Sequence, residues 1–164
     1  DSLNTKSTRD ILEILNPDLG ISLGNGYISK KTYETPKYGT INVHTEVLPK
    51  YKGAHSVIWP IYFNEETTGF TIHQIDSKID NGNILLKQQV SIKFAKKIKD
   101  TIRNTLHDIS QILPDQLLKV CENYDYYFRK SHKQTSSRSF TTPSFKEFLK
   151  MKKNNKTFYR QKIN

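Results

Sequence analysis

Two short stretches decide how this chain folds: Tyr38-Gly39-Thr40-Ile41-Asn42-Val43-His44 and, further on, Ile79-Asp80-Asn81-Gly82. Residues 40–44 combine β-branched and polar side chains, a pattern typical of a short buried strand. Residues two apart on a strand project from the same face, so Asn42 and His44 are expected to point the same way. The turn-forming sequence around Asp80 can return a carboxylate to the end of that strand. An amide, an imidazole and a carboxylate that meet at one point suit acyl transfer.

Three further motifs follow the Asn42-Val43-His44 motif. They are Leu48-Pro49-Lys50-Tyr51-Lys52-Gly53-Ala54, Thr68-Gly69-Phe70-Thr71-Ile72-His73 and Ile79-Asp80-Asn81-Gly82. In this order and spacing the four resemble the formyltransferase family, which uses 10-formyltetrahydrofolate. That family includes glycinamide ribonucleotide transformylase, methionyl-tRNA formyltransferase and the sugar-nucleotide N-formyltransferases. The resemblance covers residues 19–90, about half of the chain. It implies an α/β fold: the parallel or mixed sheet of the Rossmann-like formyltransferase domain, C-terminal half, with a helical C-terminal extension.

The resemblance also assigns roles to individual residues. It implies that Asn42, His44 and Asp80 form the catalytic trio. It further implies 10-formyltetrahydrofolate as the formyl donor, with no metal. The folate would be held by the loop that runs from His73 to Gly82 and by the backbone after the first strand. The residues expected to bind this cofactor are Gly24, Gly26, Ile28, His73, Asp76 and Gly82.

The chain departs from the family pattern in three places. Thr45-Glu46-Val47 stands where the family usually has Pro-Ser-Leu, and Lys52 stands where it usually has Arg. Lysine keeps the charge but loses the bidentate fork of arginine. These two changes bear on the acceptor. The nucleotide-binding N-terminal half of the family is not in this sequence, and the first residue is Asp1. We therefore expect a processed or truncated product, whose activity alone is an open point.

The composition describes a basic, cysteine-poor chain. Its 164 residues suffice for one domain with a core. A net charge of +10 favours anionic partners: phosphates, a polyglutamyl folate or nucleic acid. Its single cysteine, Cys121, excludes an internal disulfide and fits a reducing, cytoplasmic location. No apolar run reaches the roughly 18 residues of a membrane span, so no membrane partner is expected.

Hydrophobic periodicity predicts the order of the elements. Short strands alternate with helices, which is the arrangement of a parallel α/β sheet. The predicted domain covers residues 1–128, a polar, mobile loop covers 129–143, and a basic helix or tail covers 144–164. The predicted helices begin near residues 7, 54, 94, 115 and 144, with Pro114 ending or kinking the long one. The predicted strands cover residues 19–23, 40–44, 70–76, 83–92 and 124–128.

The sequence allows two interpretations for several side chains. His73 is either a second active-site imidazole or a hydrogen-bonded structural residue, the latter being favoured. Glu46 either contacts an amine acceptor or is a surface carboxylate. Lys50 and Lys52 either meet a phosphate or are solvated charges, again with the latter favoured. Trp59 is predicted to belong to the core, as large aromatic side chains usually do.

The predicted function is transfer of a formyl group to a primary amine. A nucleotide-linked amino sugar is the favoured acceptor, because the residues after Val90 are too few and too helical for a tRNA-binding barrel. The pattern from His55 to Trp59 also resembles sugar-modifying members of the family. A formyltetrahydrofolate hydrolase and a methionyl-tRNA formyltransferase fragment remain alternatives. A basic RNA-binding or remnant domain without catalysis is the alternative of another class. Nucleic acid is not the favoured partner, and a homodimer is left open.

Overall fold

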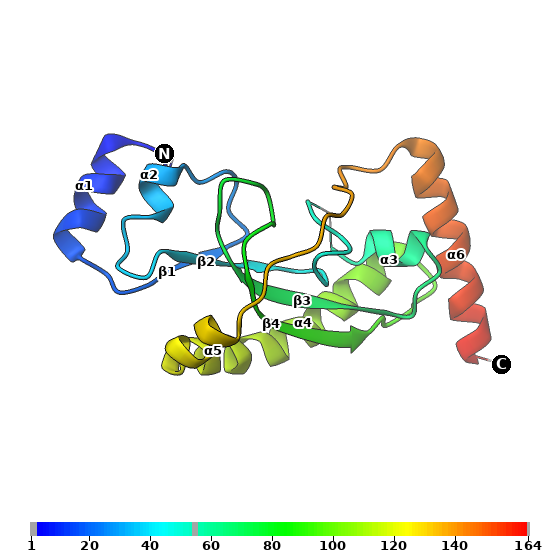
Figure 1. Ribbon diagram of the computed structural model, residues 1–164. Helices are drawn as coiled ribbons and strands as arrows, with labels where there is room; N and C mark the ends of the chain where they lie inside the picture. The colour runs from blue at the N-terminus through cyan, green and yellow to red at the C-terminus, as the bar shows by residue number, and fades with distance from the viewer. Residues whose placement is uncertain (1–2, 54–55, 164) are drawn as a thin grey trace.

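The computed structural model describes residues 3–53 and 56–163. The predicted pattern from His55 to Trp59 therefore lies partly outside the described residues. The protein is built around a four-stranded sheet whose strands are β1 (Gly20–Leu23), β2 (Thr40–His44), β3 (Thr67–Gln74) and β4 (Ile84–Ser91). The spatial order is β1-β2-β3-β4 (Figure 1). Strand β2 runs parallel to β1 and antiparallel to β3, and β4 runs antiparallel to β3. The α/β prediction is confirmed, with the sheet mixed rather than wholly parallel.

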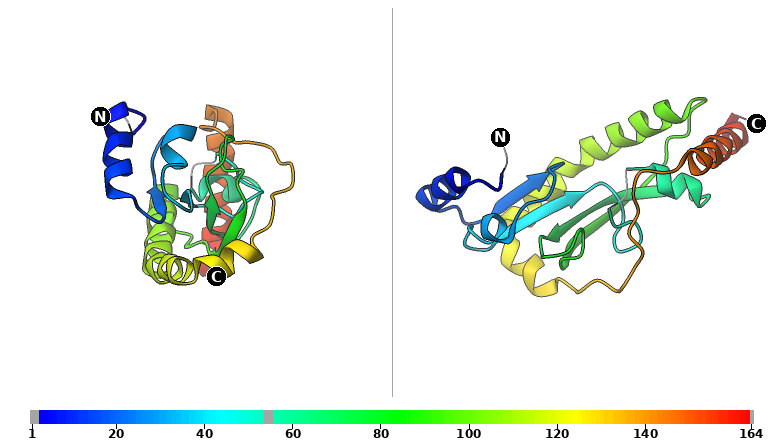
Figure 2. Two further views of the ribbon diagram at one scale, coloured as in Figure 1. Left: turned by 60° about the vertical axis from the view of Figure 1, so that its left-hand side comes forward. Right: turned by 90° about the horizontal axis from the view of Figure 1, so that it is seen from above.

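The described residues also form six helices. They are α1 (Lys6–Leu15), α2 (Lys30–Tyr33), α3 (Ile58–Tyr62), α4 (Ile98–Glu122), α5 (Tyr124–Lys130) and α6 (Phe145–Ile163). Helices α4 and α5 lie along one face of the sheet, while α1 and α2 lie near its β1 edge (Figures 1 and 2). Helix α6 packs on α3 and α4 at the opposite end of the molecule. No described helix is both long and apolar enough to cross a membrane.

Two local predictions are wrong. Pro114 does not end the long helix with a second one beginning near residue 115, because α4 continues through Pro114 to Glu122. Ile112, Leu113 and Leu117 pack against the buried cluster under the sheet, and this packing carries the helix past the missing hydrogen bond. The predicted strand at residues 124–128 is the short helix α5. Its Tyr124 is buried in the same cluster, so burial rather than β-propensity determines its conformation.

Two hydrophobic clusters form the core. The sheet cluster lies between the strands and α4, α5: Ile41, Val43, Phe70, Ile72, Leu85, Ile109, Val120 and Tyr124. The end cluster lies around α3 and α6: Tyr51, Val57, Ile58, Trp59, Ile61, Ile92, Ile98, Phe140 and Met151. Trp59 belongs to the end cluster, as predicted. Leu106 of α4 packs against both clusters and so connects them.

Residues 131–142 form an extended segment between α5 and α6, which we call the strap. The strap lies along the domain, with bridges that pair His132 with Ile84 and Ser139 with Lys52 (Figure 1). The predicted polar loop is therefore held in place by contacts with the domain. The helix predicted from the Ser144 signature is also present. The Ser144 Oγ accepts from the Glu147 N–H and a Glu147 carboxylate oxygen accepts from the Ser144 N–H, which is a capping box.

Candidate active site

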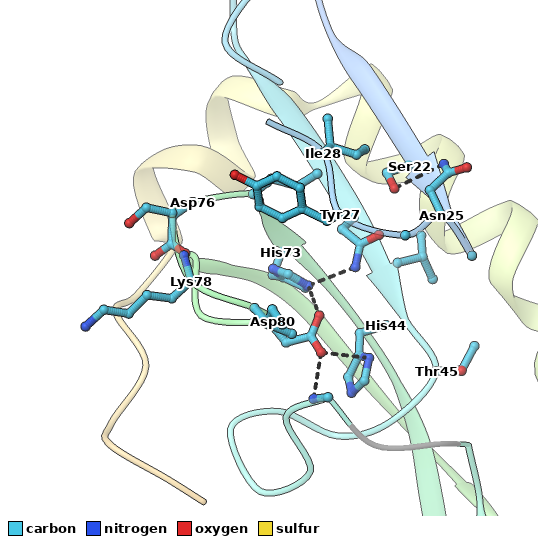
Figure 3. A pocket seen from close by; sticks show the side chains of 18 residues that line it. Ser22, Asn25, Tyr27, Ile28, His44, Thr45, His73, Asp76, Lys78 and Asp80 are labelled. Carbon is cyan, nitrogen blue, oxygen red and sulfur yellow. Dashed lines mark hydrogen bonds and ion pairs between the residues drawn. The ribbon is translucent and has the colours of Figure 1, made fainter. Parts of the chain in front are cut away.

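The alternation of side chains along β2 creates one wall of a cavity. Ile41 and Val43 are buried in the sheet cluster, while the side chains of Asn42 and His44 line the cavity. Figure 3 shows His44 at this wall. The loop after β1 and the loop after β3 supply the other walls. The cavity has a volume of about 380 Å³. Its lining comprises Ser22, residues 24–28, residues 42–45, Gly53, His73 and residues 75–80.

Asp80 lies between two imidazole rings (Figure 3). Its Oδ2 is 3.5 Å from Nδ1 of His44, and its Oδ1 is 3.5 Å from Nε2 of His73. The same Oδ2 accepts a 2.8 Å hydrogen bond from the N–H of Gly53. The backbone of Asp80 has a φ of 48°, in the left-handed region that aspartate tolerates better than most residues. This backbone conformation sets the direction in which the carboxylate leaves the turn.

Backbone carbonyls fix which ring nitrogens carry hydrogen. Nε2 of His44 lies 2.8 Å from the Tyr51 carbonyl, and Nδ1 of His73 lies 2.7 Å from the Gln74 carbonyl. A carbonyl only accepts, so both nitrogens must be protonated donors. The remaining nitrogens, Nδ1 of His44 and Nε2 of His73, both face Asp80. Asn42 Nδ2 is 3.2 Å from Nε2 of His73, and its amide hydrogen points to that nitrogen when the ring is neutral.

The protein environment lowers the pKa values of both His44 and Asp80, which favours a neutral imidazole and an ionised carboxylate. Burial lowers the pKa of His44 below its ordinary value, and the opposing effect of Asp80 does not cancel it. Burial alone would raise the pKa of Asp80. Three neighbours have the opposite effect and outweigh burial, so the pKa of Asp80 lies below its ordinary value: they are His73, His44 and the N–H of Gly53. At neutral pH the cluster therefore holds an ionised carboxylate beside a neutral His44. A neutral imidazole with a free Nδ1 can accept a proton.

The structure brings together most residues that the sequence singled out. All three members of the predicted trio line the cavity, as do Gly24, Gly26, Ile28, His73 and Asp76. A Cβ at Gly24 or Gly26 would meet no atom within 4 Å, so these glycines leave open space at the cavity. His73 is buried in the cavity wall, where it contacts both Asn42 and Asp80.

Gly82 is the exception among the predicted cofactor residues, since it is not part of the lining. A Cβ at Gly82 would lie 1.9 Å from the carbonyl oxygen of Gln74. Glycine is therefore needed at this position because two backbone segments approach each other closely. The close approach supports the turn that carries Asp80, rather than a ligand.

Both readings of Glu46 are wrong. Its side chain is 0% exposed, and its carboxylate accepts from the Val57 N–H and, at 2.8 Å, from Thr68 Oγ1. It holds the start of α3 against β3 instead of reaching the cavity. Burial raises its pKa to about 8, against the lowering effect of those hydrogen bonds.

The two loop lysines differ from each other. Lys50 is an exposed side chain paired with Glu65, which agrees with a solvated charge. Lys52 is only 4% exposed, and its Nζ donates a 2.7 Å hydrogen bond to Asn81 Oδ1. Asn81 in turn donates to Asp76. The expectation of a solvated Lys52 is wrong, because the loop folds back over the turn that carries Asp80.

Sequence reasoning also missed residues that line the cavity. Tyr27 lies beside Ile28 at the cavity, and 75% of it is exposed (Figure 3). Lys78 and Ile79 line the opposite loop. An aromatic residue directly after a glycine turn is the one signal that could have identified Tyr27. Among the described residues, no group of three or more His, Cys, Asp or Glu side chains is placed to hold a metal ion.

Comparison with known proteins identifies the family. A family model described as formyl transferase matches residues 2–117. The chain belongs to the formyl transferase family. It is 38% identical over 117 residues to the methionyl-tRNA formyltransferase of Clostridium botulinum (strain Alaska E43 / Type E3), covering 69% of this chain. The match spans 36% of that relative's length, so this chain corresponds to about a third of it.

Two solved structures share this formyl transferase fold. HypX from Aquifex aeolicus in complex with tetrahydrofolic acid matches with a TM-score of 0.69 at 19% identity. That match covers 90% of this chain and 27% of HypX. The formyltransferase PseJ from Anoxybacillus kamchatkensis matches with a TM-score of 0.62 at 26% identity. It covers 91% of this chain and 75% of PseJ. The PseJ crystal contains UDP-4,6-dideoxy-4-formamido-L-AltNAc and tetrahydrofolate.

Proposed function

We propose that this chain carries the reaction centre of an N-formyltransferase, which moves the formyl group of 10-formyltetrahydrofolate to a primary amine. The observation that carries the proposal is the arrangement of Asn42, His44 and Asp80 around one cavity. An amide donor, a neutral imidazole and an ionised carboxylate suit such a transfer. Membership of the formyl transferase family supports the same reaction.

The cavity suits a folate as the formyl donor. Its volume of about 380 Å³ is within the usual size of ligand pockets, roughly 300–1,000 Å³. The open backbone at Gly24 and Gly26, together with Ile28, would hold one side of the folate. His73, near the end of β3, and Asp76, in the loop after β3, stand on the facing side. When bound there, 10-formyltetrahydrofolate supplies an activated formyl group.

Asn42 provides the donor for the oxygen of that formyl group. Its side-chain amide carries two hydrogens, so one can stay hydrogen-bonded to Nε2 of His73 while the other is donated into the cavity. Negative charge grows on a carbonyl oxygen when an amine attacks its carbon. A fixed amide donor stabilises this charge without having to reorganise, which typically accelerates such a step by about 10²–10³.

His44 and Asp80 handle the proton that the attacking amine must lose. Nδ1 of His44 is unprotonated, since Nε2 is the nitrogen that donates to the Tyr51 carbonyl. Nδ1 can therefore accept the proton, a role usually worth about 10²–10⁴ in rate. The same proton can then pass to N10 of the folate as the bond between N10 and the formyl carbon breaks and tetrahydrofolate leaves. The Asp80 carboxylate, 3.5 Å away, stabilises the imidazolium that results and keeps the ring in position. No covalent intermediate with the protein is required, because the amine is itself the nucleophile.

The proposed acceptor is the amino group of a nucleotide-linked amino sugar. Support comes from the match to PseJ, whose crystal contains a formamido sugar linked to UDP and which this chain covers for 75% of its length. A nucleotide sugar is anionic, and the net charge of +10 favours anionic partners. The single cysteine also supports a reducing compartment, and we place the protein in the cytoplasm.

A methionyl-tRNA acceptor is the second candidate. It is favoured by the 38% identity to a methionyl-tRNA formyltransferase and by the same positive charge, which would attract RNA. A hydrolase, in which water replaces the amine, would use the same three side chains. The three reactions differ in product: a formamido sugar, formylmethionyl-tRNA, or free formate.

The deciding experiment offers these acceptors in parallel. The complete protein that contains this chain is incubated with 10-formyltetrahydrofolate and one of three additions: a UDP-linked 4-amino-4,6-dideoxy sugar, methionyl-tRNA, or buffer. Tetrahydrofolate is followed by absorbance and the products by mass spectrometry. We expect formylation of the sugar nucleotide. Formylation of the tRNA would identify methionyl-tRNA as the acceptor instead, and release of formate alone would identify a hydrolase. If no arm released tetrahydrofolate, the proposal would be refuted.

A binding measurement separates this proposal from a non-catalytic RNA-binding role. A ligand that binds only the native state raises the melting temperature. We expect 5-formyltetrahydrofolate to raise the melting temperature of this chain and a short RNA duplex to leave it within error. A shift with RNA and none with the folate would favour the RNA-binding reading.

A further inference from the structure

Every third side chain of the strap is turned toward the domain. Ser131, Gln134, Ser137 and Phe140 are turned toward the domain, and the two residues between each of them are exposed. A period of three is that of an extended polyproline-II-like chain. The pattern Ser-x-x-Gln-x-x-Ser-x-x-Phe therefore places these four side chains on the face of the strap that packs on the domain, although its composition is that of a polar loop. The strap lies beyond residue 117, where the match to the family model ends.

Gln134 is the inward residue that reaches the turn carrying Asp80. Its Nε2 donates to the carbonyl of Asp80 at 2.9 Å and to the carbonyl of Gly82 at 2.8 Å. One amide group therefore uses both of its hydrogens to bind two carbonyls of the same turn. The orientation of the amide follows from these partners, because a flipped amide would place its oxygen against two carbonyl oxygens.

This contact acts on the backbone that aims the Asp80 carboxylate. Asp80 has a positive φ, a conformation that is sparsely populated for residues other than glycine. The Oδ atoms keep their positions between His44 and His73 only while that backbone is held. Conformations of this kind persist where surrounding contacts fix them. The two hydrogen bonds from Gln134 are such contacts.

The strap also reaches the other side of the Asp80 carboxylate. The N–H of Phe140 donates to the carbonyl of Lys52 at 2.8 Å, and Ser137 Oγ donates to the carbonyl of Pro49 at 2.5 Å. These contacts support the loop segment that contains Pro49, Lys52 and Gly53. The Gly53 N–H then donates to Asp80 Oδ2. The strap thus holds both the turn that carries Asp80 and the backbone donor that binds its side chain.

We propose that Gln134 is a positioning residue for the formyl-transfer site, and that the strap sets the place of Asp80 between the two imidazoles. Gln134 touches neither the cavity nor a reacting atom. It acts through the carbonyls of Asp80 and Gly82. The role in catalysis rests on the proposed function, whereas the geometric role is independent of it.

The Gln134 amide binds the turn that carries Asp80 through its N–H groups alone, since its buried Oε1 accepts no hydrogen bond from the described residues.

The geometric role is tested by NMR titration of this chain. The variant Gln134→Met keeps the side-chain volume but removes both donors, and Gln134→Asn keeps an amide that is one methylene shorter. Thr135→Ala is the matched control, because Thr135 is the next residue of the strap and faces away. The readouts are the carboxyl carbon of Asp80 and the ring signals of His44. The titratable groups facing Asp80 among the described residues are His44 and His73.

We expect the Asp80 carboxyl of Gln134→Met to titrate about 0.5 pH unit or more above that of the parent, because the carboxylate leaves its partners. His44 should titrate at lower pH, because it loses the stabilising carboxylate. Gln134→Asn should fall between these values, and Thr135→Ala should match the parent. Unchanged Asp80 and His44 titrations in a folded Gln134→Met or Gln134→Asn would overturn the proposal. If Gln134→Met does not fold, the Asp80 and His44 titrations of Gln134→Asn decide the question.

The catalytic role is tested in the complete protein. We expect Gln134→Met to lower kcat by about 10-fold or more while KM for 10-formyltetrahydrofolate changes by less than about two-fold, since a small displacement of a catalytic group costs rate rather than binding. A lower melting temperature with an unchanged kcat would show a structural role only and would overturn this part. If the parent itself transfers no formyl group, the proposed function fails, and the NMR titration still decides the geometric role.

Discussion

Asn42 and His44 leave the same face of β2, two residues apart, and each has a distinct partner. Asn42 binds His73, while His44 faces Asp80 and donates to the backbone of Tyr51. The two side chains are therefore held in place before any ligand arrives. Preorganised donors of this kind stabilise developing charge most effectively.

The first prediction concerns the Asn42 amide. Asn42→Ala should lower kcat of formyl transfer by about 10²–10³, because the amide is the proposed donor to the formyl oxygen. Steady-state kinetics of the complete protein with 10-formyltetrahydrofolate measures this effect. Asn104→Ala is the control, since Asn104 is an exposed amide on α4, and it should retain the parent rate. A kcat within about three-fold of the parent in Asn42→Ala would remove Asn42 from the mechanism.

The second prediction concerns the buried carboxyl of Glu46. Its pKa is about 8 in the folded protein, against 4.5 as its ordinary value. As the pH rises from 4.5 to 8, the unfolded chain loses this proton while the folded protein keeps it. The unfolded state then binds fewer protons, so this group lowers the free energy of unfolding across that window, on the order of a few kcal/mol in total. Below pH 4.5 and above pH 8 its contribution is constant.

Glu46→Gln should remove this dependence. A glutamine can accept from the Val57 N–H and donate to Thr68 Oγ1, so it keeps both partners without a titrating proton. Urea unfolding at pH 5 and at pH 8 should show the parent losing more stability than the variant. Equal losses in the two proteins would mean that Glu46 is ionised throughout this range.

Helix α4 shows how an element is determined by what it packs against. It contains Pro114 and still runs from Ile98 to Glu122. Ile109 and Val120, on either side of the proline, are buried in the sheet cluster. The burial of these side chains, at about 25 cal/mol per Å² of apolar surface, outweighs one missing backbone hydrogen bond.

The third prediction follows for this helix. Pro114→Ala should raise the free energy of unfolding by about 1–2 kcal/mol, because alanine restores the N–H and removes the ring, while the unfolded chain becomes more flexible. The midpoint of urea unfolding measures this change. Asp115→Ala, at the neighbouring exposed position, should stay within about 0.5 kcal/mol of the parent. A loss of stability in Pro114→Ala would show that α4 needs a bend at the proline to fit the sheet.

Across the described residues, the core consists of the sheet cluster and the end cluster, joined through α4. The sheet cluster positions β2 and β3, which carry Asn42, His44 and His73, while the end cluster anchors α6 and the last residue of the inward strap face, Phe140. Leu106 packs against both. The strap connects the two ends on the side of the active site (Figure 1). A shared helix and a strap of this kind favour one cooperative unit.

The fourth prediction tests this cooperativity. Met151→Ala in the end cluster should lower the free energy of unfolding by about 2–5 kcal/mol, since Met151 is fully buried. Far-UV and near-UV circular dichroism should still follow one common transition. Lys152→Ala, the adjacent exposed position, should leave stability within about 0.5 kcal/mol. A separate transition for the end cluster would show two folding units.

The sequence by itself determined the local geometry of the site and of several elements. Alternation along a strand placed Asn42 and His44 on one face, and the Ser144 signature placed the start of α6, because these patterns depend on neighbours two or three residues apart. The family motifs pointed to the α/β sheet and to most of the cavity lining. These patterns did not predict that β3 runs antiparallel to β2, or that α4 continues through Pro114.

Only the tertiary structure decided which distant groups meet. Asp80 stands between rings that lie on β2 and β3, Glu46 is buried under α3, and Gln134 reaches a turn 54 residues before it. The physical reason is that local spacing sets the direction of a side chain relative to its own backbone. Its partner, its burial and hence its charge depend on how separate elements pack, and no short pattern carries that information.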